Sequence, residues 1–127
     1  MNLYFDPVFP FVVYSVEFDP DGQKLVLRGD DFISKITVTL EGDCCSQSYF
    51  ELGLVGEVEA ALKGARLFAI REVGSGRDDH YDPDKLECSR YHAIEFLTRD
   101  GVTSLDWRND SNGYYDGTAV FKYESQL

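Results

Sequence analysis

The two adjacent cysteines, Cys44 and Cys45, are the residues whose types most readily suggest chemistry. They stand in the run GDCCS, shortly before Ser48 and Glu51, whose spacing matches a capping box and predicts a helical turn from about Tyr49. A thiol at a helix N-terminus has a lowered pKa, which favours nucleophilic attack or metal binding. The sequence therefore allows a reactive thiol at this turn.

Other features weigh against a reactive thiol and against zinc. A cysteine hydrolase needs a positioned histidine, and neither His80 nor His92 lies in a recognisable motif. Zinc could use the two cysteines with Cys88 and a histidine, but the paired spacing of zinc sites is absent. We favour an interpretation in which one cysteine packs as a small apolar group while Asp43 and Ser46 bond turn amides. We therefore assign no catalytic residue, metal or cofactor.

A second group of such residues lies in the long loop predicted from Gly74 to Lys85. This loop carries four carboxylates and a histidine: Asp78, Asp79, His80, Asp82 and Asp84. Carboxylates at this spacing can surround a hard cation, but the glycine and the closing glutamate of an EF-hand are missing. We interpret the loop as solvated, or as an acidic arm for a basic partner.

A third group surrounds a turn between residues 109 and 117. Asn112-Gly113 is the strongest short hairpin signal, and turn chemistry accounts for both residues. It does not account for Tyr114 and Tyr115, which would face opposite sides of a strand. One tyrosine can then pack inward while the other is displayed, as tyrosines often are at binding surfaces.

Composition and charge narrow the classes of function. The chain has 127 residues, 43% of them hydrophobic and 14% aromatic, so it can bury a core and forms one domain over residues 1–127. Its 23 acidic and 12 basic side chains give a net charge of -11. This excess repels phosphate, which argues against direct binding of nucleic acid or of an anionic membrane. The oligomeric state stays open.

The N-terminal sequence and the cysteines indicate the cellular compartment. The N-terminus has no basic segment, and the apolar run from Val8 to Val16 is too short for a signal sequence or a membrane span. Three cysteines make an odd set without regular spacing, which favours reduced thiols in a cytoplasm.

Alternating hydrophobicity predicts strands in the first third of the chain. Two strands, near residues 12–18 and 25–27, join through a turn at Asp19–Gly22, and a third follows to about residue 41. The pattern places two sets of side chains on common faces: Val12, Tyr14, Val16 and Phe18 in the first strand, and Phe32, Ile36, Val38 and Leu40 in the third.

The rest of the chain adds a short helix and more strands. Leu54, Val58, Ala61 and Leu62 have helical spacing, with Gly64 placed to end the helix. A strand over 66–73 would put Phe68 and Ile70 on one face. Strands over 91–98 and 102–108 meet across Arg99–Gly101, and a last hairpin through Asn112-Gly113 would set Trp107 opposite Thr118 and Leu105 opposite Val120. The predicted fold is α+β, a mostly antiparallel, barrel-like meander with one or two short helices.

These strings resemble an uncharacterised domain family of phage and bacterial genomes. The resemblance rests on GDCCS followed by Ser48-Tyr49-Phe50, on Leu54-Val55-Gly56, and on SNGYY followed by Gly117, and it spans about Leu40 to Gly117. Asp116 stands where the family pattern has a small residue. The resemblance implies a small protein of phages or mobile elements that acts against host machinery, in the cytoplasm of a bacterial host.

We therefore expect a non-enzymatic acidic protein that inhibits a basic, nucleic-acid-binding host partner, such as a defence nuclease complex. Its predicted contact residues are Asp78, Asp79, Asp82, Asp84, Asp110, Tyr115 and Asp116. The alternative is a small-ligand-binding domain or enzyme whose site combines the cysteine turn and the last hairpin. That site would comprise Asp43, Cys44, Cys45, Ser46, Asn112 and Tyr114.

Overall fold

The structure, a computed structural model, describes residues 3–4, 9–43, 46–51, 55–112 and 116–125. Its elements in chain order are β1 (Leu3–Tyr4), β2 (Phe11–Phe18), β3 (Lys24–Gly29), β4 (Ser34–Gly42), β5 (Gln47–Phe50), α1 (Val55–Leu62), β6 (Arg66–Gly74), β7 (His80–Asp82), β8 (Glu87–Thr98), β9 (Gly101–Ser111) and β10 (Gly117–Ser125). In these segments, no helix is long and apolar enough to cross a membrane.

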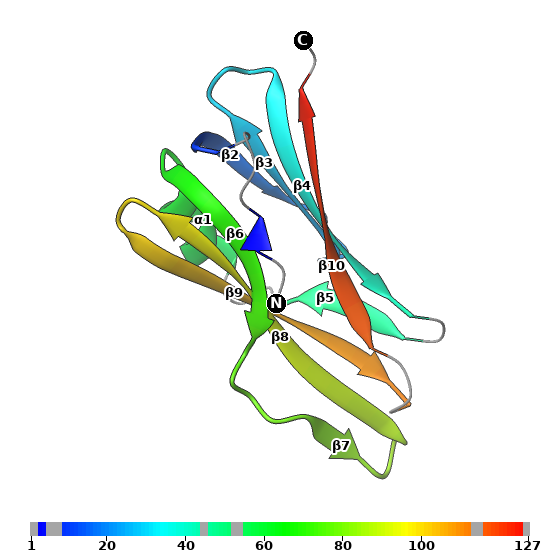
Figure 1. The fold of residues 1–127 in the computed structure, drawn as a ribbon. Helices are drawn as coiled ribbons and strands as arrows, with labels where there is room; N and C mark the ends of the chain where they lie inside the picture. The colour runs from blue at the N-terminus through cyan, green and yellow to red at the C-terminus, as the bar shows by residue number, and fades with distance from the viewer. Residues whose placement is uncertain (1–2, 5–8, 44–45, 52–54, 113–115, 126–127) are drawn as a thin grey trace.

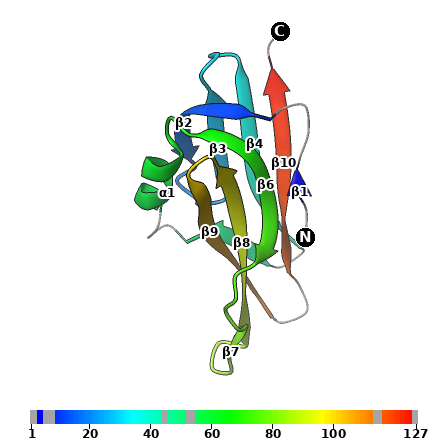
Figure 2. The ribbon, with the colours of Figure 1, turned by 60° about the vertical axis from the view of Figure 1, so that its left-hand side comes forward.

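All strand pairings are antiparallel and form one sheet, ordered β10-β4-β3-β2-β6-β8-β9-β5. The sheet bends sharply at β2, which pairs with β6 only at Phe11 and Val12. Figures 1 and 2 show the resulting two halves, β2-β3-β4-β10 and β6-β8-β9-β5, facing each other. Mostly antiparallel β structure with a short helix is thus confirmed, but the sheet does not close into a barrel, because no pairing of described residues joins β10 to β5.

The core fills the space between the two halves. Leu25, Leu27 and Val38 come from one half, and Ile94, Phe96 and Trp107 from the other, all at most 1% exposed. Helix α1 adds Val58 and Leu62 to this core, so its predicted apolar face is confirmed at those two positions, whereas Ala61 is exposed. The chain leaves the helix through Gly64, whose φ of 80° suits glycine.

The helical turn predicted near Tyr49 is wrong. Residues 47–50 form β5, and Ser48 lies opposite Asn109 of β9. The hydroxyl of Ser48 donates to the carbonyl of Glu41 and accepts from Asn109, so it satisfies strand neighbours and not a helix N-terminus. Strand pairing with β9 therefore overrides the capping pattern.

Two β-bulges change the predicted faces. In β2 the register with β3 shifts between Val13 and Ser15, which buries Val13 and leaves Tyr14 53% exposed. In β6 it shifts between Leu67 and Ala69, so Leu67 and Ile70, three residues apart, both join the core, whereas Phe68 is 41% exposed and does not share the face of Ile70. Strict alternation cannot predict an extra residue in one strand.

Phe32 also departs from its predicted place. It precedes β4 in a turn and is 75% exposed, while the rest of its predicted face, Ile36, Val38 and Leu40, is buried.

The hairpin predicted between β9 and β10 is wrong as well. β10 pairs with β4, so that Thr118 lies opposite Glu41 and Val120 opposite Thr39. Trp107 instead lies between Phe50 of β5 and His92 of β8. The edge of β9 that a hairpin would need is occupied by β5, and the chain crosses from one half of the sheet to the other. The β2–β3 and β8–β9 hairpins, by contrast, are confirmed.

Candidate functional site

Acidic side chains from three distant segments gather at one end of the molecule. Strand β7 places Asp82 opposite Glu87, and β9 places Asp110 opposite Ser89. The N–H of Asp43, after β4, donates to the carbonyl of Asp116 over 2.9 Å. This region lies around β7, the ends of β4 and β9 and the start of β10 (Figure 1), and we call it the acidic end. It comprises Asp43, Asp78, Asp79, Asp82, Asp84, Glu87, Asp110 and Asp116.

The loop between β6 and β8 is more ordered than its composition predicts. Part of it forms β7, and the carboxylate of Asp82 accepts hydrogen bonds from the N–H groups of Asp84 and Lys85, over 3.0 and 3.4 Å. This bonding is the usual turn chemistry of aspartate. It directs Asp84 to solvent, where Asp78 and Asp79 are exposed too.

Asp116 is the hub of the acidic end. One carboxylate oxygen lies 2.9 Å from Nε2 of His92, and the other 3.8 Å from Arg90. Arg90 also lies 3.8 Å from Asp79, so one cation links two acids that are distant in sequence. The His92 ring stacks on Trp107 at 4.3 Å between centroids, which anchors the hub to the core.

Beneath the hub lies a buried polar cluster around Asn109, which is 0% exposed. Its amide nitrogen donates to the hydroxyls of Ser46 and Ser48, over 3.0 and 2.9 Å. Gly117 packs against this cluster so closely that a β-carbon there would lie 2.1 Å from the Ser48 hydroxyl. Within the described segments, the Asn109 side-chain oxygen has no hydrogen-bond partner, although most buried acceptors have one.

The opposite face of β5 and β9 carries a second network of side-chain hydrogen bonds. Arg108 donates through Nε to the Tyr49 hydroxyl, which donates to Asp110; Ser89 also donates to Asp110, over 2.7 Å. Burial, followed by the hydrogen bond to Asp110, raises the pKa of Tyr49 to about 12. Arg108 also donates to Asp110, over 3.2 Å. Asp110 is therefore held by three side chains and is less available to a partner than the exposed loop acids.

A polar groove of about 490 Å³ opens beside these networks. It joins β5, the β7–β8 turn and the end of β9, and is lined by Ser46, Gln47, Lys85, Leu86, Glu87, Asp110, Ser111 and Asn112. The structure thus brings together Ser46 and Asn112, two residues predicted for a ligand site from separate motifs. Asp110, predicted as a partner contact, lines the same groove.

The chain belongs to the family Domain of unknown function (DUF7448). The family model matches residues 12–121, which confirms the resemblance to an uncharacterised family and extends it over the first hairpin. The chain matches no curated protein and no solved structure.

Several predicted site residues of this DUF7448 chain lie outside the described residues: Cys44, Cys45, Tyr114 and Tyr115. Cys88 is described, half-buried on β8 opposite Ser111. The described residues contain no group of three His, Cys, Asp or Glu side chains that could hold a metal ion.

Sequence reasoning missed the residues that organise this end, above all Asn109 and Arg90. Asn109 stands close to Asn112-Gly113 in the sequence, so the pattern predicts a turn residue. Its buried role follows only from its position opposite Ser48 on the neighbouring strand. The sequence carries no signal of that opposition, because it depends on β5 occupying the edge of β9.

Proposed function

We propose that this DUF7448 protein is a non-enzymatic inhibitor that binds the basic, nucleic-acid-binding surface of a host protein through its acidic end. The observation that supports the proposal is the gathering of acids from three chain segments at one end of the molecule. Clustered carboxylates with exposed positions can occupy cation sites that normally hold phosphates.

The fixed geometry of the acidic end supports recognition over simple solubility. Asp116 and Asp110 are held by His92, Arg90, Arg108 and Tyr49, whereas the acids at the rim are solvated. Acids that are already positioned lose less conformational entropy on binding than free side chains do. In this proposal the protein comes from a phage or a mobile element and acts in the bacterial cytoplasm against a defence nuclease complex or a similar target.

The test compares two variants with equal changes of charge. Asp78→Asn, Asp79→Asn and Asp84→Asn together neutralise exposed acids of the acidic end, while Glu57→Gln, Glu59→Gln and Asp100→Asn neutralise three exposed acids elsewhere. Immobilised wild-type protein should capture a nucleic-acid-binding protein from a bacterial lysate, and added duplex DNA or RNA should displace it. The first triple variant should lose the capture, and the second should keep it.

Two outcomes would contradict this function. One is equal loss of capture by both triple variants, which would indicate a non-specific charge effect. The other is a captured protein that binds the wild type and nucleic acid at the same time.

A second candidate function is favoured by the polar groove. Its volume of about 490 Å³ falls in the range of small-molecule sites, and its lining includes the predicted ligand residues Ser46 and Asn112. A polar metabolite that binds there should raise the melting temperature of the wild type. The increase should be lost in Asn112→Ala and kept in Lys63→Ala, and equal increases in both variants would exclude this groove.

A further inference from the structure

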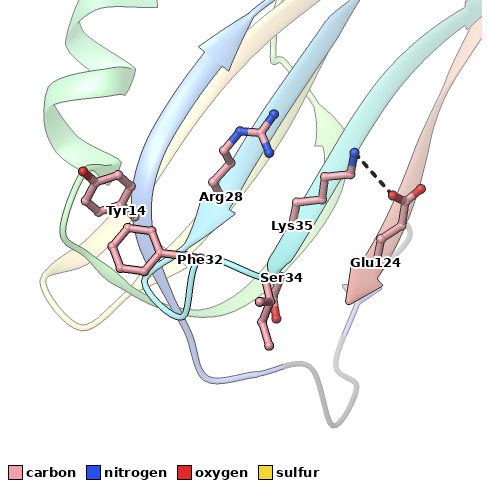
Figure 3. A pocket seen from close by; sticks show the side chains of 8 residues that line it. Tyr14, Arg28, Phe32, Ser34, Lys35 and Glu124 are labelled. Atoms are coloured by element: carbon pink, nitrogen blue, oxygen red, sulfur yellow. Dashed lines mark ion pairs between the residues drawn. The ribbon is translucent and has the colours of Figure 1, made fainter. Parts of the chain in front are cut away.

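A separate hollow of about 140 Å³, whose lining includes no residue of the acidic end, lies beside the β3–β4 turn on the outer face of the β2-β3-β4-β10 half (Figure 3). The neighbours Leu27 and Ile36 point into the core, so Arg28 and Lys35 point outward across adjacent strands. Its lining includes Tyr14, Arg28, Phe32, Ser34, Lys35 and Glu124.

Phe32 forms one wall of the hollow in an unfavourable backbone conformation. Its φ is 65°, in the left-handed region that bulky residues rarely adopt, and its side chain is 75% exposed. The ring packs edge-on against Tyr14, with 4.9 Å between centroids. Strain of this kind persists where the surroundings enforce it, and it is concentrated at functional sites.

The enforcing group is Asp31. Its carboxylate accepts hydrogen bonds from the N–H groups of Ile33 and Ser34, over 3.0 and 2.9 Å, and from the Ser34 hydroxyl over 2.6 Å. These bonds, the Ser34 hydroxyl foremost, lower the pKa of Asp31, so the carboxylate stays ionised at neutral pH. The turn therefore holds an aromatic ring in solvent where a glycine would fit without strain.

The charge of the lining differs from that of the chain. Acids outnumber bases 23 to 12 overall, yet the hollow has two cations, Arg28 and Lys35, and one carboxylate. That carboxylate, on Glu124, is shared by Lys35 at 3.3 Å and Lys122 at 2.9 Å. Arg28 is itself ion-paired with Glu17, to which its Nε donates over 3.2 Å. Figure 3 shows both cations between the aromatic pair and Glu124. Each cation is ion-paired within the chain, so a partner carboxylate would exchange with Glu17 or Glu124.

The volume limits what can enter. Pockets for whole small molecules are usually about 300–1,000 Å³, whereas a cavity of roughly 150 Å³ holds a single benzene ring. We propose that this hollow binds a partner-protein segment that presents one aromatic side chain flanked by carboxylates. The site is independent of the acidic end and has the opposite charge preference, so the domain would carry two distinct docking surfaces.

Synthetic five-residue peptides with blocked ends test this directly. The probe Glu-Glu-Phe-Glu-Glu should shift the backbone amide signals of residues 28–35 and 124 in a two-dimensional NMR titration of the full chain. Glu-Glu-Ala-Glu-Glu and Lys-Lys-Phe-Lys-Lys should bind at least about tenfold more weakly, because each lacks one recognition element. No shifts with the first peptide, shifts centred elsewhere, or equal binding of the lysine peptide would overturn the proposal.

Substitutions distinguish a loss of peptide binding from a loss of folding. Glycine accommodates a φ of 65°, so Phe32→Gly should leave the thermal midpoint within a few degrees while it weakens peptide binding at least about tenfold. Phe68→Ala and Lys24→Gln change an exposed aromatic and an exposed cation outside the hollow and should bind the peptide as wild type does. Unchanged binding by Phe32→Gly, or equal losses in the two controls, would contradict the assignment. The triple variant of the acidic end should bind normally, so this proposal and the proposed function fail separately.

Discussion

At the scale of single residues, Gly117 occupies a position in the acidic end that has no space for a side chain. It begins β10 where that strand packs against the Asn109 cluster, and a β-carbon would lie 2.1 Å from the Ser48 hydroxyl and 2.6 Å from the Glu41 carbonyl. One of these contacts is backbone, which cannot turn away. Only a residue without a side chain therefore fits at this position, where β10 packs against Ser48 and Asn109 of the other half of the sheet.

Gly117→Ala should lower the free energy of unfolding by about 1–3 kcal/mol, the usual cost of an added group in a packed site. Gly74→Ala is the matched control, because its β-carbon would meet nothing within 4 Å. Chemical denaturation of both variants provides the measurement. A Gly117→Ala variant as stable as the Gly74→Ala variant would show that the halves do not pack as described.

The Tyr49 network makes the free energy of unfolding depend on pH in the alkaline range. The pKa of Tyr49 is raised to about 12 in the folded chain, by burial first and the bond to Asp110 second, so folding favours the neutral phenol. The resulting stability is complete below the ordinary tyrosine pKa of about 10 and is lost as pH rises through about 12. Between these values the unfolding free energy of wild type should fall more steeply with pH than that of Tyr49→Phe. Parallel curves would mean that this hydroxyl titrates normally.

At the scale of elements, the pairing of β10 with β4 joins strands that are far apart in the sequence. β10 pairs with β4 along its whole length, from Gly117 opposite Gly42 to Ser125 opposite Ser34. Opposed residues in an antiparallel pair have α-carbons about 4.5–5.5 Å apart, which suits a disulfide. Engineered cysteines can therefore distinguish this pairing from a local β9–β10 hairpin.

Glu41→Cys with Thr118→Cys should form a disulfide on mild oxidation, and peptide mapping by mass spectrometry should locate it, because these residues face each other. Ser104→Cys with Phe121→Cys is the counterpart that a β9–β10 hairpin would bring together. This second pair should stay unlinked. A bond between residues 104 and 121, and none between 41 and 118, would restore the local hairpin.

These elements also show what sequence can predict. The β2–β3 and β8–β9 hairpins follow from alternation and nearby turn residues, and α1 follows from Val58 and Leu62 at helical spacing. The bulges at Val13 and Leu67 do not follow, because one extra residue reverses the faces of a strand without a mark in composition. Nor does the burial of Asn109, because its contacts with Ser46 and Ser48 depend on strand order.

At the scale of the whole molecule, charge is distributed unevenly. The net charge of -11 includes the acidic end, where eight acids lie with Arg90, Arg108 and Lys85, while the lining of the hollow at Phe32 has two cations and one acid. Like charges held close together in the folded state oppose folding. This cost supports the proposed role in recognition over a role in solubility, for which dispersed acids would serve equally well.

This distribution predicts a measurable stability difference between the two triple variants. Neutralising Asp78, Asp79 and Asp84 should raise the free energy of unfolding by about 0.5–1 kcal/mol at low salt, because it relieves repulsion among crowded acids. Neutralising Glu57, Glu59 and Asp100, which lie outside the crowd, should raise it less. The difference should shrink from about 0.02 M to about 0.3 M NaCl, since the Debye length falls from roughly 20 Å to roughly 6 Å. Equal effects of the two triples at every salt concentration would indicate a diffuse acidic coat, and the case for a dedicated recognition surface would then rest on binding alone.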